Sequence, residues 1–177
     1  DVGGEYNGVT TGQSLQDDRT PEQLTAEAVE AAKKADYVIF VGGMNKAHHQ
    51  DCEDGDRLHY ELPYGQDQLI SALAAVNNRV IFVSVSGNAH GMPWVNEVEA
   101  ILQAWYSGSE TGHAVADIIF GDVNPSGKMP YTIQPTLADY PAHQYGEIAY
   151  PGVDKQVHYM EDIFVGYRYA DLYGRRR

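Results

Sequence analysis

Residues 37–62 read YVIFVGGMNKAHHQDCEDGDRLHYEL, a short apolar run followed by a long polar one. The first five residues are β-branched or aromatic without polar alternation, which is typical of a strand covered on both faces in a parallel sheet. From Gly42 onward, charged and histidine side chains dominate, so this part cannot form core. Because open α/β sheets place ligand chemistry in loops after the carboxyl ends of strands, the loop at 42–62 is the candidate site.

The segments around this loop alternate between helical and strand patterns. Thr20-Pro21-Glu22-Gln23 predicts a helix start with a capping box, and the apolar face continues to about residue 35. Further elements are predicted as helices at 66–76, 94–98 and 110–120, buried strands at 79–85 and 100–106, and an edge strand at 128–133, where Pro130 lacks a donor. This order with short connections predicts an α/β fold built on a parallel sheet.

Composition divides the chain into three parts. Residues 1–19 have no period and predict a linker or interdomain tail, whereas 20–134 carry the α/β pattern. Residues 135–177 are rich in tyrosine and lack helical periodicity, so we expect an irregular arm of the same domain, with one strand at 163–165. The first residues lack a signal-peptide pattern, so we expect a mature chain or one excised from a longer protein.

Several classes of partner are disfavoured by composition. A net charge of −13 repels nucleic acid, and no segment approaches the ~20 apolar residues of a membrane helix. A single cysteine excludes an intrachain disulfide. The glycines at 42–43 and 121–127 do not match dinucleotide or P-loop spacing, so we expect no cofactor.

The polar loop admits several interpretations. A metal site has suitable ligand types there, but the adjacent His48 and His49 point apart and no second pair is spaced for zinc, so we expect no metal. A thiol nucleophile at Cys52 is disfavoured because neighbouring carboxylates oppose the thiolate. A solvated acidic loop without chemistry also fits the spacing.

An acid/base site is a further interpretation of the crowded carboxylates. Glu53 lies beside Asp51, Asp54 and Asp56, and Arg57 is placed to pair with one of them. Crowding moves carboxyl pKa values apart, so that one group stays ionised and another holds the proton that general acid catalysis needs. Trp105 and Tyr106, at the end of the predicted strand 100–106, fit two interpretations: they are core or rim aromatics, the more usual role, or they face the same crevice, where an aromatic ring can stack on a sugar.

Motifs along the chain resemble the second domain of family 3 glycoside hydrolases, the β-glucosidase and β-xylosidase group. The resemblance covers about residues 20–170, and its most specific parts are GDVNPSGKMP at 121–130 and FVGYRY at 164–169. Weaker parts are DCEDGDR at 51–57, SGN at 86–88, AWY at 104–106 and ETG at 110–112. It implies a three-layer α/β sandwich with a mostly parallel sheet of about six strands, one edge strand antiparallel, packed on an amino-terminal (β/α)8 barrel.

In this family the barrel supplies an aspartate nucleophile and a loop of the sandwich domain supplies the general acid/base. The resemblance places that role on the glutamate three residues before the aspartate of the DR pair, which is Glu53, with Asp51 as the fallback. The sequence departs from the family pattern at Asp51 and Asp54, where the family has glutamate and glycine. These departures leave open which carboxylate acts.

The resemblance therefore implies a domain of a retaining, exo-acting β-glycosidase that is inert without its barrel. Its substrate would be a terminal β-linked sugar, with His48, His49, Arg57 and Trp105 as candidate substrate-binding residues. It also favours a periplasmic or extracellular location. The rival interpretations are a non-catalytic carbohydrate-binding or interaction module on the same scaffold, and a flavodoxin-like or receiver domain.

Overall fold

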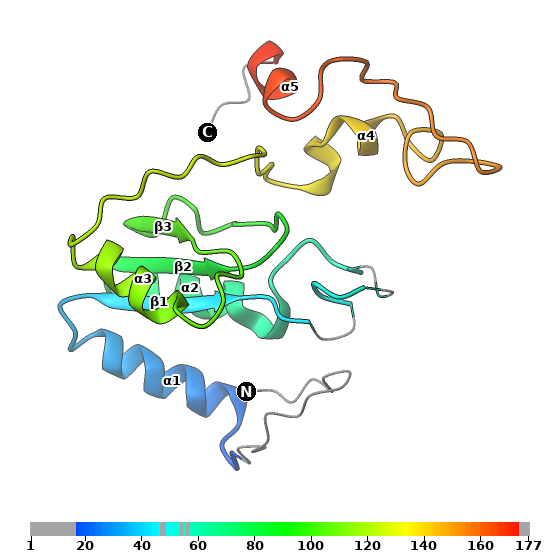
Figure 1. Ribbon diagram of the computed structural model, residues 1–177. Coiled ribbons are helices and arrows are strands. Elements are labelled where there is room, and N and C mark those ends of the chain that lie inside the picture. Colours follow the sequence, from blue (N-terminus) through cyan, green and yellow to red (C-terminus); the bar gives the residue numbers. More distant parts are fainter. Residues whose placement is uncertain (1–16, 47–48, 54, 56, 174–177) are drawn as a thin grey trace. The chain divides into compact units, whose positions relative to one another are not determined.

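The computed structural model describes residues 17–46, 49–53, 55 and 57–173 (Figure 1). His48, Asp54 and Asp56 therefore lie outside the described residues. The chain forms two compact units, one ending at Asn124 and the other beginning at Pro125. The boundaries predicted from composition stay predictions.

The first unit is built on a parallel sheet, as the sequence predicts. Its strands are β1 (Val38–Gly43), β2 (Val80–Val85) and β3 (Ala100–Gln103), in the order β1-β2-β3. The described residues contain three strands and not about six, and every pairing among them is parallel. The carboxyl ends of the strands share one edge of the sheet, where the polar loop begins (Figure 1).

Three predicted elements differ in the structure. Residues 128–133 form no strand: Pro130 lacks an N–H and the whole stretch 121–130 is exposed. Residues 163–165 form turn and coil before α5 (Tyr167–Leu172), because apolar, β-branched composition does not make a strand without a pairing partner. Residues 94–98 form turns and not a helix.

The other three helices predicted in the first unit are confirmed with adjusted ends: α1 (Pro21–Ala32), α2 (Gln66–Ala74) and α3 (Thr111–Ile119). The capping box is present, since the Gln23 amide donates to Thr20 Oγ1 at 3.3 Å and the Thr20 amide donates to Gln23 Oε1 at 2.8 Å. A 3-10 turn at Pro63–Gly65 leads directly into α2. Helices α1 and α2 bury Ala32 and Leu73 against Val80 of the sheet.

A second core cluster holds the base of the polar loop. It contains Phe82 and Trp94, both fully buried, together with Ile70 of α2 and two residues at opposite ends of the loop, Met44 and Leu62. The Trp94 indole N–H donates to Asp67 Oδ1 at 2.6 Å, so this buried aromatic has its polar atom satisfied. The loop thus leaves and re-enters the same cluster.

Two strands begin with the same four residues, VIFV, at 38–41 and 80–83. They pair in register, with Val38 opposite Val80 and Val41 opposite Val83. Burial on both faces, predicted for both strands, holds for β2 but not for β1: Val83 is fully buried, whereas Val41 is 64% exposed. The strand β1 lies at the edge of the described sheet, which leaves its outer side uncovered.

The second unit contains little regular structure. Its elements are a 3-10 turn at Leu137–Asp139, α4 (Pro141–Gln144) and α5. Tyr169 is buried and its hydroxyl donates to Gln144 Oε1 at 2.7 Å, but most apolar side chains of this unit are exposed. Across both units, no described helix combines the length and the apolar character needed to cross a membrane.

Candidate functional site

The polar loop starts from a fixed point at the end of β1. Gly43 has φ +134°, and a Cβ there would lie 2.0 Å from the Val85 carbonyl oxygen, so only glycine fits. The Gln66 side chain brackets this residue: Oε1 accepts from the Gly43 amide and Nε2 donates to the Gly43 carbonyl, each at 2.8 Å. The direction in which the chain leaves the sheet is therefore set by backbone contacts.

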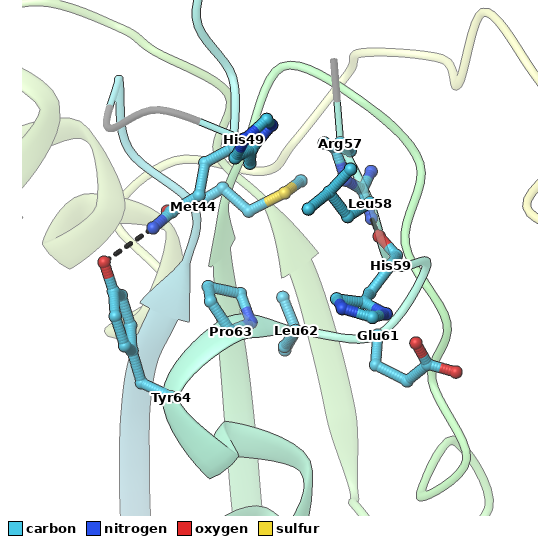
Figure 2. Close-up of a pocket in the computed structure, with 10 residues that line it drawn as sticks. Met44, His49, Arg57, Leu58, His59, Glu61, Leu62, Pro63 and Tyr64 are labelled. Atoms are coloured by element: carbon cyan, nitrogen blue, oxygen red, sulfur yellow. Dashed lines mark hydrogen bonds between the residues drawn. The ribbon is translucent and has the colours of Figure 1, made fainter. Parts of the chain in front are cut away.

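Gln50 organises the first limb of the loop from inside. Its side chain is buried, with Oε1 accepting from the Asn45 amide at 3.0 Å and Nε2 donating to the Tyr64 hydroxyl at 2.6 Å, the dashed line in Figure 2. The Asp51 amide donates to the Asn45 carbonyl at 2.9 Å. These bonds close the loop on itself just before the acidic residues.

Asp51 joins the loop to the segments after the other two strands. Its Oδ2 accepts from the Gly87 amide and from the Tyr106 hydroxyl, both at 2.7 Å. Its Oδ1 accepts from Asn88 Nδ2 at 2.8 Å. Both carboxylate oxygens are therefore occupied by donors from elsewhere in the fold.

Glu53 lies in a tight turn immediately beyond Asp51. Cys52 and Gly55 form an antiparallel bridge, and the Cys52 thiol lies 3.5 Å from the Gly55 carbonyl oxygen. The Glu53 side chain is exposed, and no other described residue bonds to it. The turn thus presents one unengaged carboxyl group on the surface of the unit.

Arg57 closes the second limb of the loop. Its Nη1 donates to the Ala89 carbonyl at 2.5 Å, and its Nη2 donates to the carbonyls of His59 and Tyr60 at 3.1 and 2.9 Å. Among the described residues it forms no ion pair with a carboxylate, in contrast to the pairing expected from the sequence. Its predicted role in substrate binding stays a prediction.

A pocket of about 300 Å³ opens between the two limbs (Figure 2). Its polar lining comes from His49, Gln50, Arg57, His59, Glu61 and Tyr64, and Met44 and Leu58 are among its apolar residues. It brings together two predicted substrate-binding residues, His49 and Arg57, but Trp105 is not among those that line it. Trp105 lies just beyond β3 with φ +57° and is partly buried.

The fold and these motifs agree with a known family. A model of the glycosyl hydrolase family 3 C-terminal domain matches residues 4–167. The chain belongs to glycoside hydrolase family 3.

Curated relatives of this family 3 domain are β-glucosidases. The chain is 55% identical over 152 residues to the β-glucosidase BoGH3A of Bacteroides ovatus, covering 86% of this chain and 20% of that protein. It is 44% identical over 154 residues to the probable β-glucosidase H of Aspergillus oryzae, covering 86% of this chain and 18% of that protein. The chain thus spans about a fifth of the length of these relatives.

Solved structures of β-glucosidases share the fold. A β-glucosidase from Kluyveromyces marxianus in complex with glucose matches 89% of this chain and 18% of its own, with a TM-score of 0.78 and 33% identity. DesR, a β-glucosidase from Streptomyces venezuelae in complex with D-glucose, matches 88% of this chain and 20% of its own, with a TM-score of 0.77 and 36% identity. The flavodoxin-like or receiver interpretation is therefore set aside.

The family 3 domain also has a buried polar network under the loop. The His90 ring is fully buried, with Nε2 at 3.0 Å from Ser84 Oγ and Nδ1 at 3.0 Å from the Gly91 carbonyl oxygen. A carbonyl only accepts, so Nδ1 carries the proton and Nε2 accepts from the serine. Burial lowers the pKa of His90, which favours the neutral ring that these two contacts need.

Two further serine and glutamine contacts complete this network. Gln103 Nε2 donates to the Ser86 carbonyl at 3.0 Å and to Ser86 Oγ at 3.1 Å. The sequence signal for it is a serine inside an otherwise apolar strand, Ser84, and a second serine just after that strand, Ser86. Within the part of the chain that is described, no three His, Cys, Asp or Glu side chains gather as a metal-binding cluster.

Proposed function

We propose that this chain is the acid/base-contributing domain of a retaining, exo-acting β-glucosidase. The observation that carries the proposal is the exposed Glu53 carboxyl on a tight turn at the carboxyl edge of a family 3 sheet. The named relatives are β-glucosidases, and two of the similar structures hold glucose. The proposed substrate is therefore a terminal β-linked glucose.

In this mechanism Glu53 serves twice. An aspartate of a barrel domain attacks the anomeric carbon while Glu53 protonates the departing glycosidic oxygen. Glu53 then takes a proton from the water that attacks the same carbon and releases the sugar. The two carboxyl groups stand about 5–5.5 Å apart in a retaining enzyme, so the domain has to dock closely on the barrel.

Glu53 suits this role better than Asp51. A general acid must turn its proton toward the leaving oxygen, and both oxygens of Asp51 already accept hydrogen bonds from three donors. Asp51 would have to break at least one of these bonds to act. No other described residue forms a hydrogen bond with Glu53, so its carboxyl group can turn without breaking one.

The rest of the enzyme is proposed to lie elsewhere in the polypeptide, because the chain spans only about 20% of its relative from Bacteroides ovatus. Ile39 and Val41 of β1, with Tyr37 just before it, are exposed and alternate along the chain, so they share one face, and parallel strands are normally covered on both faces. We propose that another part of the polypeptide covers this face and that further strands extend the sheet to about six. The exposed tyrosines of the second unit, Tyr159 and Tyr167 among them, are candidates to contact the barrel.

The test uses the complete polypeptide that carries this sequence and β-glucosides with leaving groups of different basicity. In Glu53→Gln, turnover of methyl β-glucoside should fall by about 10²–10⁴-fold, because a poor leaving group needs the proton most. Turnover of 2,4-dinitrophenyl β-glucoside should fall far less in its first step. Glu97→Gln, at an exposed position after Trp94, is the matched control and should keep full activity.

A second measurement identifies the residue chemically. In Glu53→Ala, azide should restore turnover of the dinitrophenyl substrate by attacking the anomeric carbon of the glycosyl-enzyme, breaking its ester bond to the aspartate and releasing β-glucosyl azide. Full activity of Glu53→Gln on methyl β-glucoside would show that another group is the acid/base. The 177-residue chain alone is expected to hydrolyse none of these substrates.

A further inference from the structure

The turn that carries Glu53 is joined to Asp51 by a short connection. Only Cys52 separates the two residues, and Cys52 is bridged to Gly55 across the turn. Any movement of Asp51 therefore moves the base of the turn and with it the Glu53 carboxyl. The hydrogen bonds of Asp51 consequently influence the orientation of the Glu53 side chain.

Both limbs of the loop hold the same short segment after β2. The Asp51 carboxylate accepts from the Gly87 amide and the Asn88 side chain, and the Arg57 side chain donates to the Ala89 carbonyl. We call these two side chains, Asp51 and Arg57, the loop clamp. Three consecutive residues, 87–89, thus fix the positions of the chain on both sides of Glu53.

The segment held by the clamp rests on the buried polar network. Ser86 Oγ donates to the Asn88 carbonyl at 3.2 Å, and the Gly91 amide donates to the Tyr60 carbonyl at 2.9 Å. A Cβ at Gly87 would lie 3.2 Å from the Tyr106 ring and 3.5 Å from Asp51 Oδ2, so glycine leaves room for both groups to approach. The clamp is therefore anchored to a satisfied, rigid base.

We infer that Asp51 is a positioning residue for Glu53: its carboxylate holds the turn on the Gly87–Ala89 segment so that the Glu53 carboxyl meets the glycosidic oxygen. This inference rests on the proposed role of Glu53. Hydrogen bonds to an ionised carboxylate are stronger than neutral ones, so three of them make a stiff anchor. Displacing a catalytic group by about 1 Å costs on the order of 10²-fold in rate.

The main variant is Asp51→Asn in the complete polypeptide. Asparagine is neutral and offers one acceptor oxygen and an NH₂ group, so the bonds lose their ionic partner, and the bond with Asn88 is kept only if the Asn88 amide turns its oxygen toward the new NH₂ group. Turnover (kcat) of methyl β-glucoside should fall about 10- to 100-fold with little change in KM, because Glu53 is present but misplaced. The first step on 2,4-dinitrophenyl β-glucoside, measured as kcat/KM, should fall by much less, because this leaving group needs little help from an acid. Asp117→Asn, at an exposed position of α3, is the control and should match the wild type.

Tyr106→Phe is a second variant that keeps the charge of Asp51. It removes one of the three donors and should show the same selective loss on the poor leaving group, to a smaller extent. Hydrogen exchange of the amides of 49–53 should quicken in both variants, while that of β2 stays unchanged. These readouts distinguish a loosened turn from general unfolding.

Three results would overturn the inference. One is wild-type turnover of methyl β-glucoside by both variants. Another is an equal loss of kcat/KM on all leaving groups, which would indicate a binding or folding defect. The third is formation of β-glucosyl azide by Asp51→Asn, which would make Asp51 itself the acid/base. Failure of the proposed function is a separate result, since it appears as full activity in Glu53→Gln.

Discussion

The two strands that begin with VIFV can be compared directly, because their first four residues are the same. Residues 38–41 and 80–83 have the same sequence and lie opposite each other in register, yet Val80, Phe82 and Val83 are fully buried whereas Ile39 and Val41 are 43% and 64% exposed. The four residues are identical, so the difference comes from the surroundings: β2 has a strand on each side and β1 has one, and the described residues leave the face of β1 with Ile39 and Val41 largely uncovered. Burial in a sheet is set by what packs beside and over each strand.

The largest difference should appear at the phenylalanine pair. Phe82 is fully buried and its ring centroid lies 4.6 Å from Trp94, whereas Phe40 is half-buried and 5.8 Å from Phe82. Phe82→Ala should lower the free energy of unfolding by about 3–5 kcal/mol, and Phe40→Ala by roughly 1–3 kcal/mol. Urea unfolding of the 177-residue chain measures both.

Phe82→Leu keeps the phenylalanine test usable if the alanine variant unfolds. It preserves most of the volume and should cost less than about 1.5 kcal/mol. Equal losses for the two alanine variants would mean that β1 is covered as fully as β2 in solution. The difference in burial between the two strands, on which the comparison depends, would then be wrong.

The sequence predicted the local parts of this fold and not its extent. The capping box at Thr20 and the apolar run of β2 depend on residues close in sequence, and both appear in the structure. The strands expected at 128–133 and 163–165 needed pairing partners that local composition cannot supply. The expectation of about six strands came from the family resemblance, and the described residues form three.

In the candidate site, too, the local features could be predicted from the sequence and the long-range contacts could not. An acidic turn after a buried strand could be recognised from the sequence, and Glu53 could be singled out by its motif. The donors to Asp51, however, come from 36, 37 and 55 residues along the chain. Nothing in local spacing indicates that Gly87, Asn88 and Tyr106 converge on one carboxylate, so its anchoring role needed the structure.

The ends of the two strands offer the next test. Gly43 closes β1 with φ +134° and no room for a Cβ beside the Val85 carbonyl. Gly43→Ala should cost about 2–3 kcal/mol, because the backbone strain adds to a clash with a fixed strand. Gly112→Ala is the matched control: it lies in α3 with open space around it and should gain about 0.5–1 kcal/mol. Chemical denaturation of the two variants should give shifts of opposite sign.

A smaller effect is expected at the final valines of the shared sequence. Val83→Ala should cost roughly 2 kcal/mol in the 177-residue chain, and Val41→Ala less than about 0.5 kcal/mol. In the complete polypeptide, Val41→Ala should become more costly if another part of the chain covers this face of β1. An unchanged, small cost there would contradict the proposal that this face is covered.

The smallest effect concerns the segments beyond the two VIFV runs, because β2 leads to the buried His90 and β1 does not. Burial lowers the pKa of His90, so its folded value lies below the unfolded value of about 6.5. Above that pH both states are neutral at this ring, and the histidine adds no pH dependence. As the pH falls below 6.5, the unfolded chain binds a proton that the folded chain refuses, so the free energy of unfolding falls by up to about 1.4 kcal/mol per pH unit until the folded pKa is reached.

Urea unfolding at pH 7.5 and 5.5 measures this contribution. His90→Gln removes the titrating ring; it should be less stable at both pH values and should lose less stability than the wild type between them. His158→Gln, at an exposed position, is the control and should keep the wild-type difference. If His90→Gln showed the full wild-type pH dependence, the ring would be exchanging protons freely with solvent. The network beneath the loop clamp would then be open to water, and the rigid base argued for Asp51 would be lost with it.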